Sequence, residues 1–131
     1  MNPPRTTLTG YFGKSAPLSA ITHFKAEDKC VTAYHADGEI ILTQTIDALE
    51  AEFGETFIVC CRGTLVAKSR VVAFSHDTAT RAWSLYLDGA GPIVMSRRHR
   101  KAVLSAIPGL VRRTVNPSRM TKERYAANQS V

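Results

Sequence analysis

Residues 83–88 constrain the fold of this chain more than any other stretch, because large apolar side chains occupy every second position. Trp83, Leu85 and Leu87 alternate with more polar residues, and a two-residue period is typical of a strand with one buried face. The Asp-Gly-Ala-Gly run at 88–91 predicts a turn. The pattern therefore predicts an antiparallel pair in which the chain returns through 92–95.

Similar short runs recur along the chain. Asp37-Gly38 stands between two apolar runs and is a strong hairpin signal, and Leu65-Val66 is predicted to lie on a turn or short strand. The remaining predicted strands cover residues 18–25, 30–35, 39–43, 57–62 and 70–74.

Two stretches change to a helical period. Ile46, Leu49 and Phe53 recur at i, i+3 and i+7, with acidic residues on the other face, and predict a helix over 45–53. Apolar residues at helical spacing predict a second helix over 96–107. Many short strands with two small helices favour a mainly antiparallel β domain.

The second helix begins with an unusual concentration of charge, since 96–101 reads Ser-Arg-Arg-His-Arg-Lys. Ser96 can cap the helix by accepting a free amide hydrogen of the first turn. Cations near a helix N-terminus are unfavourable by a few tenths to about 1 kcal/mol each, yet Arg97, Arg98 and Arg100 all lie there. A bound anion would remove this conflict, and phosphate is the commonest one. We therefore expect the ligand here.

The positive charge of the chain is segregated. Residues 1–95 hold 8 Lys+Arg and 10 Asp+Glu, whereas residues 96–131 hold 9 Lys+Arg and 1 Asp+Glu. A one-sided cluster favours a polyanion such as nucleic acid or an acidic membrane face. No apolar run approaches the length of a membrane span and no signal-peptide core is visible. We therefore expect a soluble cytoplasmic protein that does not insert into a membrane.

The length of 131 residues fits one domain with tails. Residues 1–16 are rich in Thr, Gly and Pro and are predicted to be a linker or leading arm, residues 17–107 the folded domain, and residues 108–131 a basic flexible tail. The three cysteines lack metal-ligand spacing. Cys60-Cys61 is interpreted as a pair of small apolar strand residues, with a redox switch beside Arg62 as the alternative.

Four pieces of the chain, taken in order, resemble the LytTR family of bacterial DNA-binding domains, which are output modules of many response regulators. The resemblance spans about residues 17–107. The pieces are Ile-Thr-His-Phe-Lys-Ala-Glu-Asp-Lys-Cys-Val at 21–31, Thr-Ile-Asp-Ala-Leu-Glu at 45–50 followed by Phe57, Arg62-x-x-Leu65-Val66, and Met-Ser-Arg-Arg-His at 95–99.

The resemblance implies an elongated stack of small antiparallel sheets that inserts loops into successive major grooves of double-stranded DNA, often as two copies on direct repeats. Guanidinium groups can pair bidentately with guanine, while Lys and helix amides suit phosphate. By position, the resemblance puts Lys29 on the first DNA-facing loop, Arg62 on the second and Arg98 on the third, with Arg97, His99 and Lys101 beside Arg98.

The second loop departs from the family pattern. Val59 and Cys61 stand where the family usually has Arg and His, Ala67 stands where it has Asn, and Gly63-Thr64 replaces the usual Ser or Asn and its neighbour. In a strand of period two, Val59 and Cys61 share the face of Phe57. We therefore expect both in the core, with the fold unaffected.

The sequence predicts a sequence-specific double-stranded DNA-binding domain of a bacterial transcription regulator. We expect no catalytic step, no cofactor, no metal site and no small-molecule substrate, and two copies could bind direct repeats. The alternative is a protein-interaction module with LytTR architecture that has lost specific readout, which the altered second loop and the lack of a receiver domain in this sequence permit.

Each predicted DNA contact has a simpler alternative. Arg98 could belong to a solvated helix face. Arg62 or Lys29 could form a loop ion pair with Glu27 or Asp28, an interaction that contributes little to stability. The crowding of three cations at one helix start favours the DNA contact most strongly for Arg98.

Overall fold

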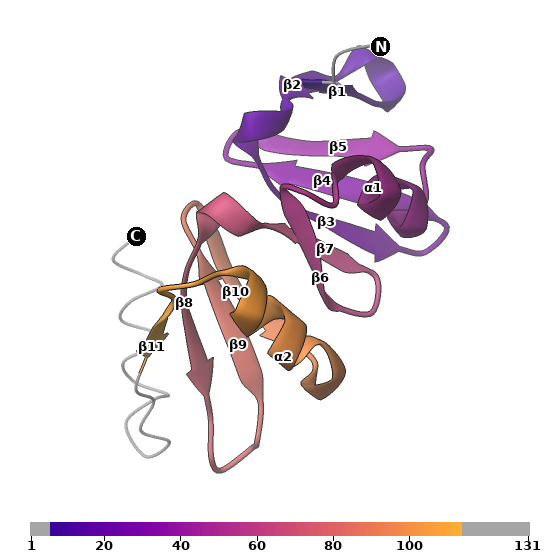
Figure 1. Cartoon of the computed structure of the whole chain (residues 1–131). Helices are drawn as coiled ribbons and strands as arrows, with labels where there is room; N and C mark the ends of the chain where they lie inside the picture. Colours follow the sequence, from indigo (N-terminus) through magenta and orange to yellow (C-terminus); the bar gives the residue numbers. More distant parts are fainter. Residues whose placement is uncertain (1–5, 114–131) are drawn as a thin grey trace.

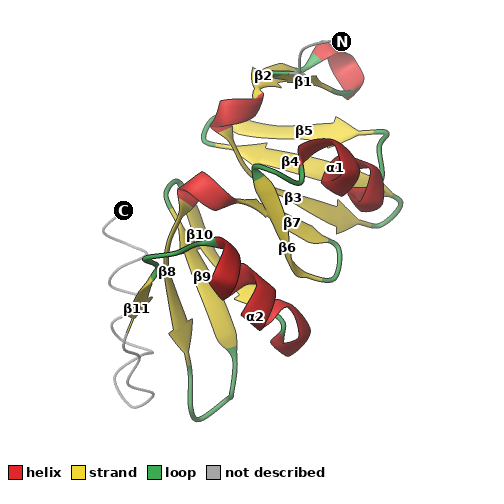
Figure 2. Cartoon of the chain, viewed as in Figure 1, coloured by secondary structure: helices red, strands yellow, loops and turns green. Residues whose placement is uncertain are grey.

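The computed structural model of the chain describes residues 6–113. Three sheets follow one another along the molecule, with one α-helix beside the middle sheet and one beside the last (Figure 1). Strand predominates over helix throughout (Figure 2). These features confirm the predicted fold class, a mainly β stack of small sheets with two short α-helices.

A five-stranded antiparallel sheet, here called the central sheet, forms the middle of the molecule in the order β5-β4-β3-β7-β6. A hairpin joins β4 to β5 as predicted, but its turn residues are Ala36 and Asp37 instead of Asp37-Gly38, because the register pairs His35 with Gly38. Leu18–Ala20, predicted as strand, forms the 3₁₀ helix η2 instead. The strands are β3 (Ile21–Glu27), β4 (Cys30–His35), β5 (Gly38–Leu42), β6 (Phe57–Cys61) and β7 (Thr64–Ala67).

The helix α1 (Ile46–Phe53) covers one face of the central sheet. It begins where predicted, because the Thr45 hydroxyl accepts a hydrogen bond from the Ala48 amide at 3.1 Å. Phe53 packs with Phe24 at 6.4 Å between ring centroids. No helix within residues 6–113 is long and apolar enough to cross a membrane.

The last sheet, here called the C-terminal sheet, has the order β10-β9-β8-β11 and carries the helix α2 (Arg97–Ala106). The 3₁₀ helix η3 (Lys68–Arg70) leads into it from the central sheet. The pair predicted from the alternation at 83–88 is confirmed as β9 and β10, joined by a turn. The strands are β8 (Val71–His76), β9 (Trp83–Leu87), β10 (Ala90–Met95) and β11 (Val111–Arg113).

The strand β11 corrects the prediction of a flexible tail that starts at residue 108. It pairs in parallel with β8, with Val111 opposite Ala73, so the chain returns to the sheet after α2. A three-residue strand at a sheet edge has no room for a visible period, which explains why the sequence pattern missed it. The rest of the predicted tail, residues 114–131, lies outside the described residues.

The pair β6 and β7 separates two hydrophobic cores. Phe57 and Val59 pack into the first core with α1, and Ile58 and Cys60 pack into the second with α2 and the C-terminal sheet. Cys61 was predicted to share the face of Phe57, and this is wrong. The register shifts between Val59 and Cys61, so an irregularity in the strand brings Cys61 into the second core beside Cys60.

The beginning of the chain also differs from the prediction of a leading arm. Strands β1 (Thr7–Thr9) and β2 (Ser15–Pro17) form a hairpin around the 3₁₀ helix η1 (Tyr11–Gly13). Leu8 is completely buried in the first core. Gly10 lies so close to β5 that a side chain would collide with the Ile41 carbonyl oxygen. Residues 7–17 therefore form a hairpin that packs against the first core.

Candidate nucleic-acid interface

Three segments with predicted cations lie on one side of the molecule, namely the β3–β4 turn, the β6–β7 turn and the beginning of α2 (Figure 1). Backbone hydrogen bonds connect them. The Ala26 amide donates to the Gly63 carbonyl oxygen at 2.8 Å, and the Ser96 amide donates to the Cys60 carbonyl oxygen at 2.9 Å. We call the resulting surface the loop face and define it as residues 28–29, 62–63 and 97–101.

The beginning of α2 is held by Ser96, as predicted. The Ser96 hydroxyl accepts from the His99 amide at 3.4 Å and lies 2.6 Å from His99 Nδ1. Cap and ring together fix the first turn, while other amides of that turn have no helical partner. His99 is half-buried. Its ring contacts Ser96, and this contact supports the first turn of α2.

The cations of α2 crowd the positive end of the helix. Arg97, Arg98, Arg100 and Lys101 are all exposed, and the first turn contains no acidic residue. This arrangement opposes the helix dipole and is stabilised when an anion binds there. The structure thus retains the unfavourable interaction between these cations and the helix dipole, from which the sequence analysis predicted an anion site.

Arg100 differs from the other cations because it lies over an aromatic ring. Its guanidinium carbon is 4.7 Å from the centroid of Trp83, and the Trp83 ring stacks on His76 at 4.1 Å. A cation over an indole is stabilised by the negative face of the ring. The contact ties α2 to β9 and was not visible in the sequence, since the two residues lie on separate elements.

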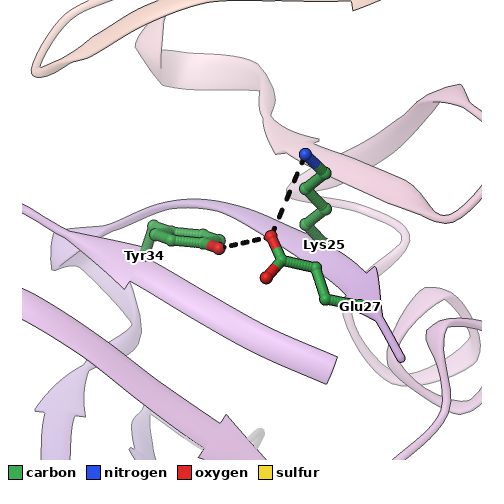
Figure 3. A network of polar contacts seen from close by, with 3 residues as sticks. All are labelled: Lys25, Glu27 and Tyr34. Atoms are coloured by element: carbon green, nitrogen blue, oxygen red, sulfur yellow. Dashed lines mark hydrogen bonds and ion pairs between the residues drawn. The ribbon is translucent and has the colours of Figure 1, made fainter. Parts of the chain in front are cut away.

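The first turn of the loop face presents Lys29. Asp28 adopts the left-handed conformation with φ of 54°, which Asp tolerates better than most residues, and both residues are exposed. Glu27 contacts Lys25 and Tyr34 instead of Lys29 (Figure 3). Within residues 6–113 Lys29 has no ion-pair partner, so the predicted alternative of a loop ion pair is not formed.

The second turn presents Arg62 beside Gly63. Gly63 has φ of 78°, a conformation that glycine adopts without strain, and its carbonyl oxygen accepts the bond from the first turn. Arg62 is exposed and forms no ion pair with any residue that the structure describes. Its guanidinium group can therefore reach a ligand from a fixed backbone.

Cys61 lies where the second turn meets α2. The neighbouring Cys60 side chain lowers the pKa of Cys61 to about 6 against the opposing effect of burial, and the Thr64 hydroxyl and the nearby His99 and Lys25 side chains act in the same direction as Cys60. The sequence interpretation attributed any such effect to Arg62, whereas the structure attributes it to these neighbours. All three cysteines are free.

The structure brings all six predicted contact residues to the loop face. Lys29 and Arg62 occupy adjoining turns, and the others share the first turns of α2. Lys25 was missed. It lies on β3 with 56 % of its side chain exposed, two residues before Glu27, and the two-residue period of a strand could have placed it on the same face.

Replacing Ser96 with Ala should lower the free energy of unfolding by about 1 kcal/mol, because the cap acceptor is lost. A urea titration followed by circular dichroism measures this as a lower midpoint. Ser105→Ala is the control, since Ser105 is exposed within α2 and Ala is the better helix former. Equal midpoints for Ser96→Ala and the unaltered protein would contradict a stabilising cap.

The cations and free amides of the loop face can bind the bases and phosphates of a nucleic acid. Guanidinium groups can bind guanine O6 and N7, and Lys with free helix amides can bind phosphate. Within the described residues no group of three His, Cys, Asp or Glu side chains could hold a metal ion. The electrostatics of this surface therefore favour a polyanion.

Comparison with known proteins finds a relative in sequence and a relative in fold. Over 85 residues, 63 % of this chain, the sequence is 40 % identical to the positive alginate biosynthesis regulatory protein of Pseudomonas aeruginosa. The match covers 34 % of that relative, so this chain spans about a third of its length. The fold is similar to the LytTr DNA-binding domain of a Bacillus cereus protein, with a TM-score of 0.67 and 19 % identity over 78 % of this chain and 94 % of that one.

The family model of the LytTr DNA-binding domain matches residues 14–107. This range includes the central sheet, both α-helices and the whole loop face. The β1 strand and β11 lie outside it. The chain belongs to the LytTR family of DNA-binding domains.

Proposed function

We propose that this chain is a sequence-specific double-stranded DNA-binding domain of a bacterial transcription regulator. The observation that carries the proposal is the loop face, in which three cation-bearing segments are joined by backbone hydrogen bonds and end at the open amides of α2. Such a surface can follow a duplex over more than one groove. No step of this function requires catalysis.

The contact residues divide by their chemistry. Arg98 and Arg62, on separate segments, are assigned to base edges in successive major grooves, because guanidinium groups can pair with guanine. Lys29, on the first turn, is assigned to phosphate. Arg97 and Lys101 are assigned to phosphates together with the α2 amides. His99 supports the helix start through Ser96 and contacts DNA from the same turn.

The regulatory context is supported by a relative whose name describes a positive regulator of alginate biosynthesis. We infer a cytoplasmic regulator in which the DNA-binding domain extends from β1 to β11 and two copies occupy direct repeats. The basic residues after 113 lie outside the described residues. We therefore assign them no contact with DNA.

Selection from a random duplex library tests the proposal. We expect enrichment of one short motif, and binding to it should fall by roughly a hundredfold between about 50 and 200 mM salt if about four phosphates are neutralised. Motif-free binding that moderate salt abolishes would contradict sequence-specific readout. It would favour a polyanion patch on a domain with a different partner.

A further inference from the structure

Four side chains form a connected row beside the first DNA-facing turn. Tyr34 on β4 lies opposite His23 on β3 in the strand register, and the two rings stack at 4.6 Å with 10° between their planes. The Tyr34 hydroxyl donates to Glu27 Oε1 at 2.6 Å, and Lys25 Nζ lies 3.9 Å from the same oxygen (Figure 3).

The row fixes the direction of the Glu27 side chain. Glu27 ends β3, and the alternation of a strand puts it on the same face as His23 and Lys25. Stacking on His23 limits the tilt of the Tyr34 ring, so the hydroxyl is held near the end of β3. The hydrogen bond to Glu27 raises the pKa of Tyr34 to about 12, the direction expected of a hydroxyl that donates to a carboxylate.

A free carboxylate at this position would oppose DNA binding. Glu27 is two residues from Lys29, which corresponds to at most about 7 Å along the backbone. This is shorter than the screening length of about 10 Å at 0.1 M salt. An extended Glu27 would therefore repel any phosphate near the first turn and weaken the field of Lys29.

We propose that Tyr34 and Lys25 act as positioning residues that hold the Glu27 carboxylate against the central sheet, so that the first turn offers the Lys29 cation to DNA. The inference rests on the proposed function, since it concerns the same surface. It explains how an acidic strand end can adjoin a DNA-facing turn.

Tyr34→Phe tests this role, because it removes the hydrogen bond without changing the charge. We expect the affinity for the selected DNA motif to fall at low salt by up to about threefold, because the whole interaction of one exposed charge in water at this range has that size and the substitution only frees the existing Glu27 charge to move. The loss should shrink as salt rises. Fluorescence anisotropy with a labelled duplex measures both effects.

The decisive experiment repeats Tyr34→Phe in a protein that also carries Glu27→Gln. Gln retains the shape and an acceptor oxygen but carries no charge, so Tyr34→Phe should then have no effect on affinity. Tyr86→Phe is the matched control, since the Tyr86 hydroxyl also lies within hydrogen-bond distance of a side chain, Ser75 Oγ at 3.0 Å. It lies on the C-terminal sheet, and its affinity should equal that of the unaltered protein.

The outcomes separate the two proposals. An equal loss from Tyr34→Phe in both backgrounds, or no loss in either, would overturn the positioning role while DNA binding itself stands. A loss that salt does not reduce would also overturn it. If the unaltered protein binds no duplex, the proposed function fails and the inference fails with it.

Discussion

Replacing Arg98 with Ala is expected to weaken binding to the selected DNA motif by about 1–3 kcal/mol, the range for one bidentate pair with a base. Arg98 is exposed at the second position of α2. The backbone behind it is fixed by the Ser96 cap and by the bond to the Cys60 carbonyl oxygen. Because this backbone is already ordered, only the Arg98 side chain has to be ordered when it binds, and its removal should remove the base contact without disturbing the helix start.

Titrating each variant with the motif and with an unrelated duplex distinguishes the loss of a base contact from the loss of a positive charge. Arg98→Ala should weaken binding to the motif much more than to the unrelated duplex, whereas Lys101→Ala should weaken both alike. Arg112→Ala is the control for net charge, because Arg112 is exposed on β11, away from the loop face (Figure 1). Unchanged binding of Arg98→Ala to the motif would show that α2 does not read the bases.

The elements that the sequence predicted well are those whose signals are local. The hairpin signal at Asp37-Gly38 is local and predicted the β4–β5 hairpin, although its turn residues are Ala36 and Asp37. Ser96 begins α2 through a hydrogen bond with His99, three residues away. The alternation in β9 is visible because Leu85 and Leu87 on one face are buried, whereas the residues on the other face are only partly buried. The cations of α2 could be predicted as a site because their conflict with the helix dipole needs no tertiary information.

The missed features depend on contacts between distant segments. The contact of Arg100 with Trp83 joins α2 to β9, and the position of Cys61 depends on an irregularity in the register with β7. A one-residue shift moves a side chain to the other face, so the period of β6 gave the wrong core for Cys61. The partners of Glu27 also could not be assigned, because Tyr34 reaches it from the neighbouring strand.

The N-terminal hairpin was missed for a different reason. A three-residue strand contains one inward side chain and cannot display a period, so the Thr, Gly and Pro residues around it resembled a linker. The single inward side chain of β1 is Leu8, which is paired with Ala16 and fully buried. Burial of that one residue distinguishes a folded hairpin from a leading arm.

Leu8→Ala is therefore expected to lower the free energy of unfolding by about 2–5 kcal/mol, the range for removing a buried leucine and leaving a cavity. Leu8 packs into the first core, which also contains Phe24 and Leu49, so the loss should affect cooperative unfolding of the whole domain. A urea titration measures it, with a lower midpoint and an unchanged slope.

Thr9→Ala is the matched control, since Thr9 is the exposed neighbour on the same strand and its replacement should change stability by less than about 0.5 kcal/mol. DNA binding below the unfolding transition should be unchanged in both variants, because neither residue belongs to the loop face. If Leu8→Ala were as stable as Thr9→Ala, residues 7–17 would be the leading arm that their composition suggests. A large difference between the two would establish that the hairpin completes the first core and that the folded domain begins before residue 14, where the family match starts.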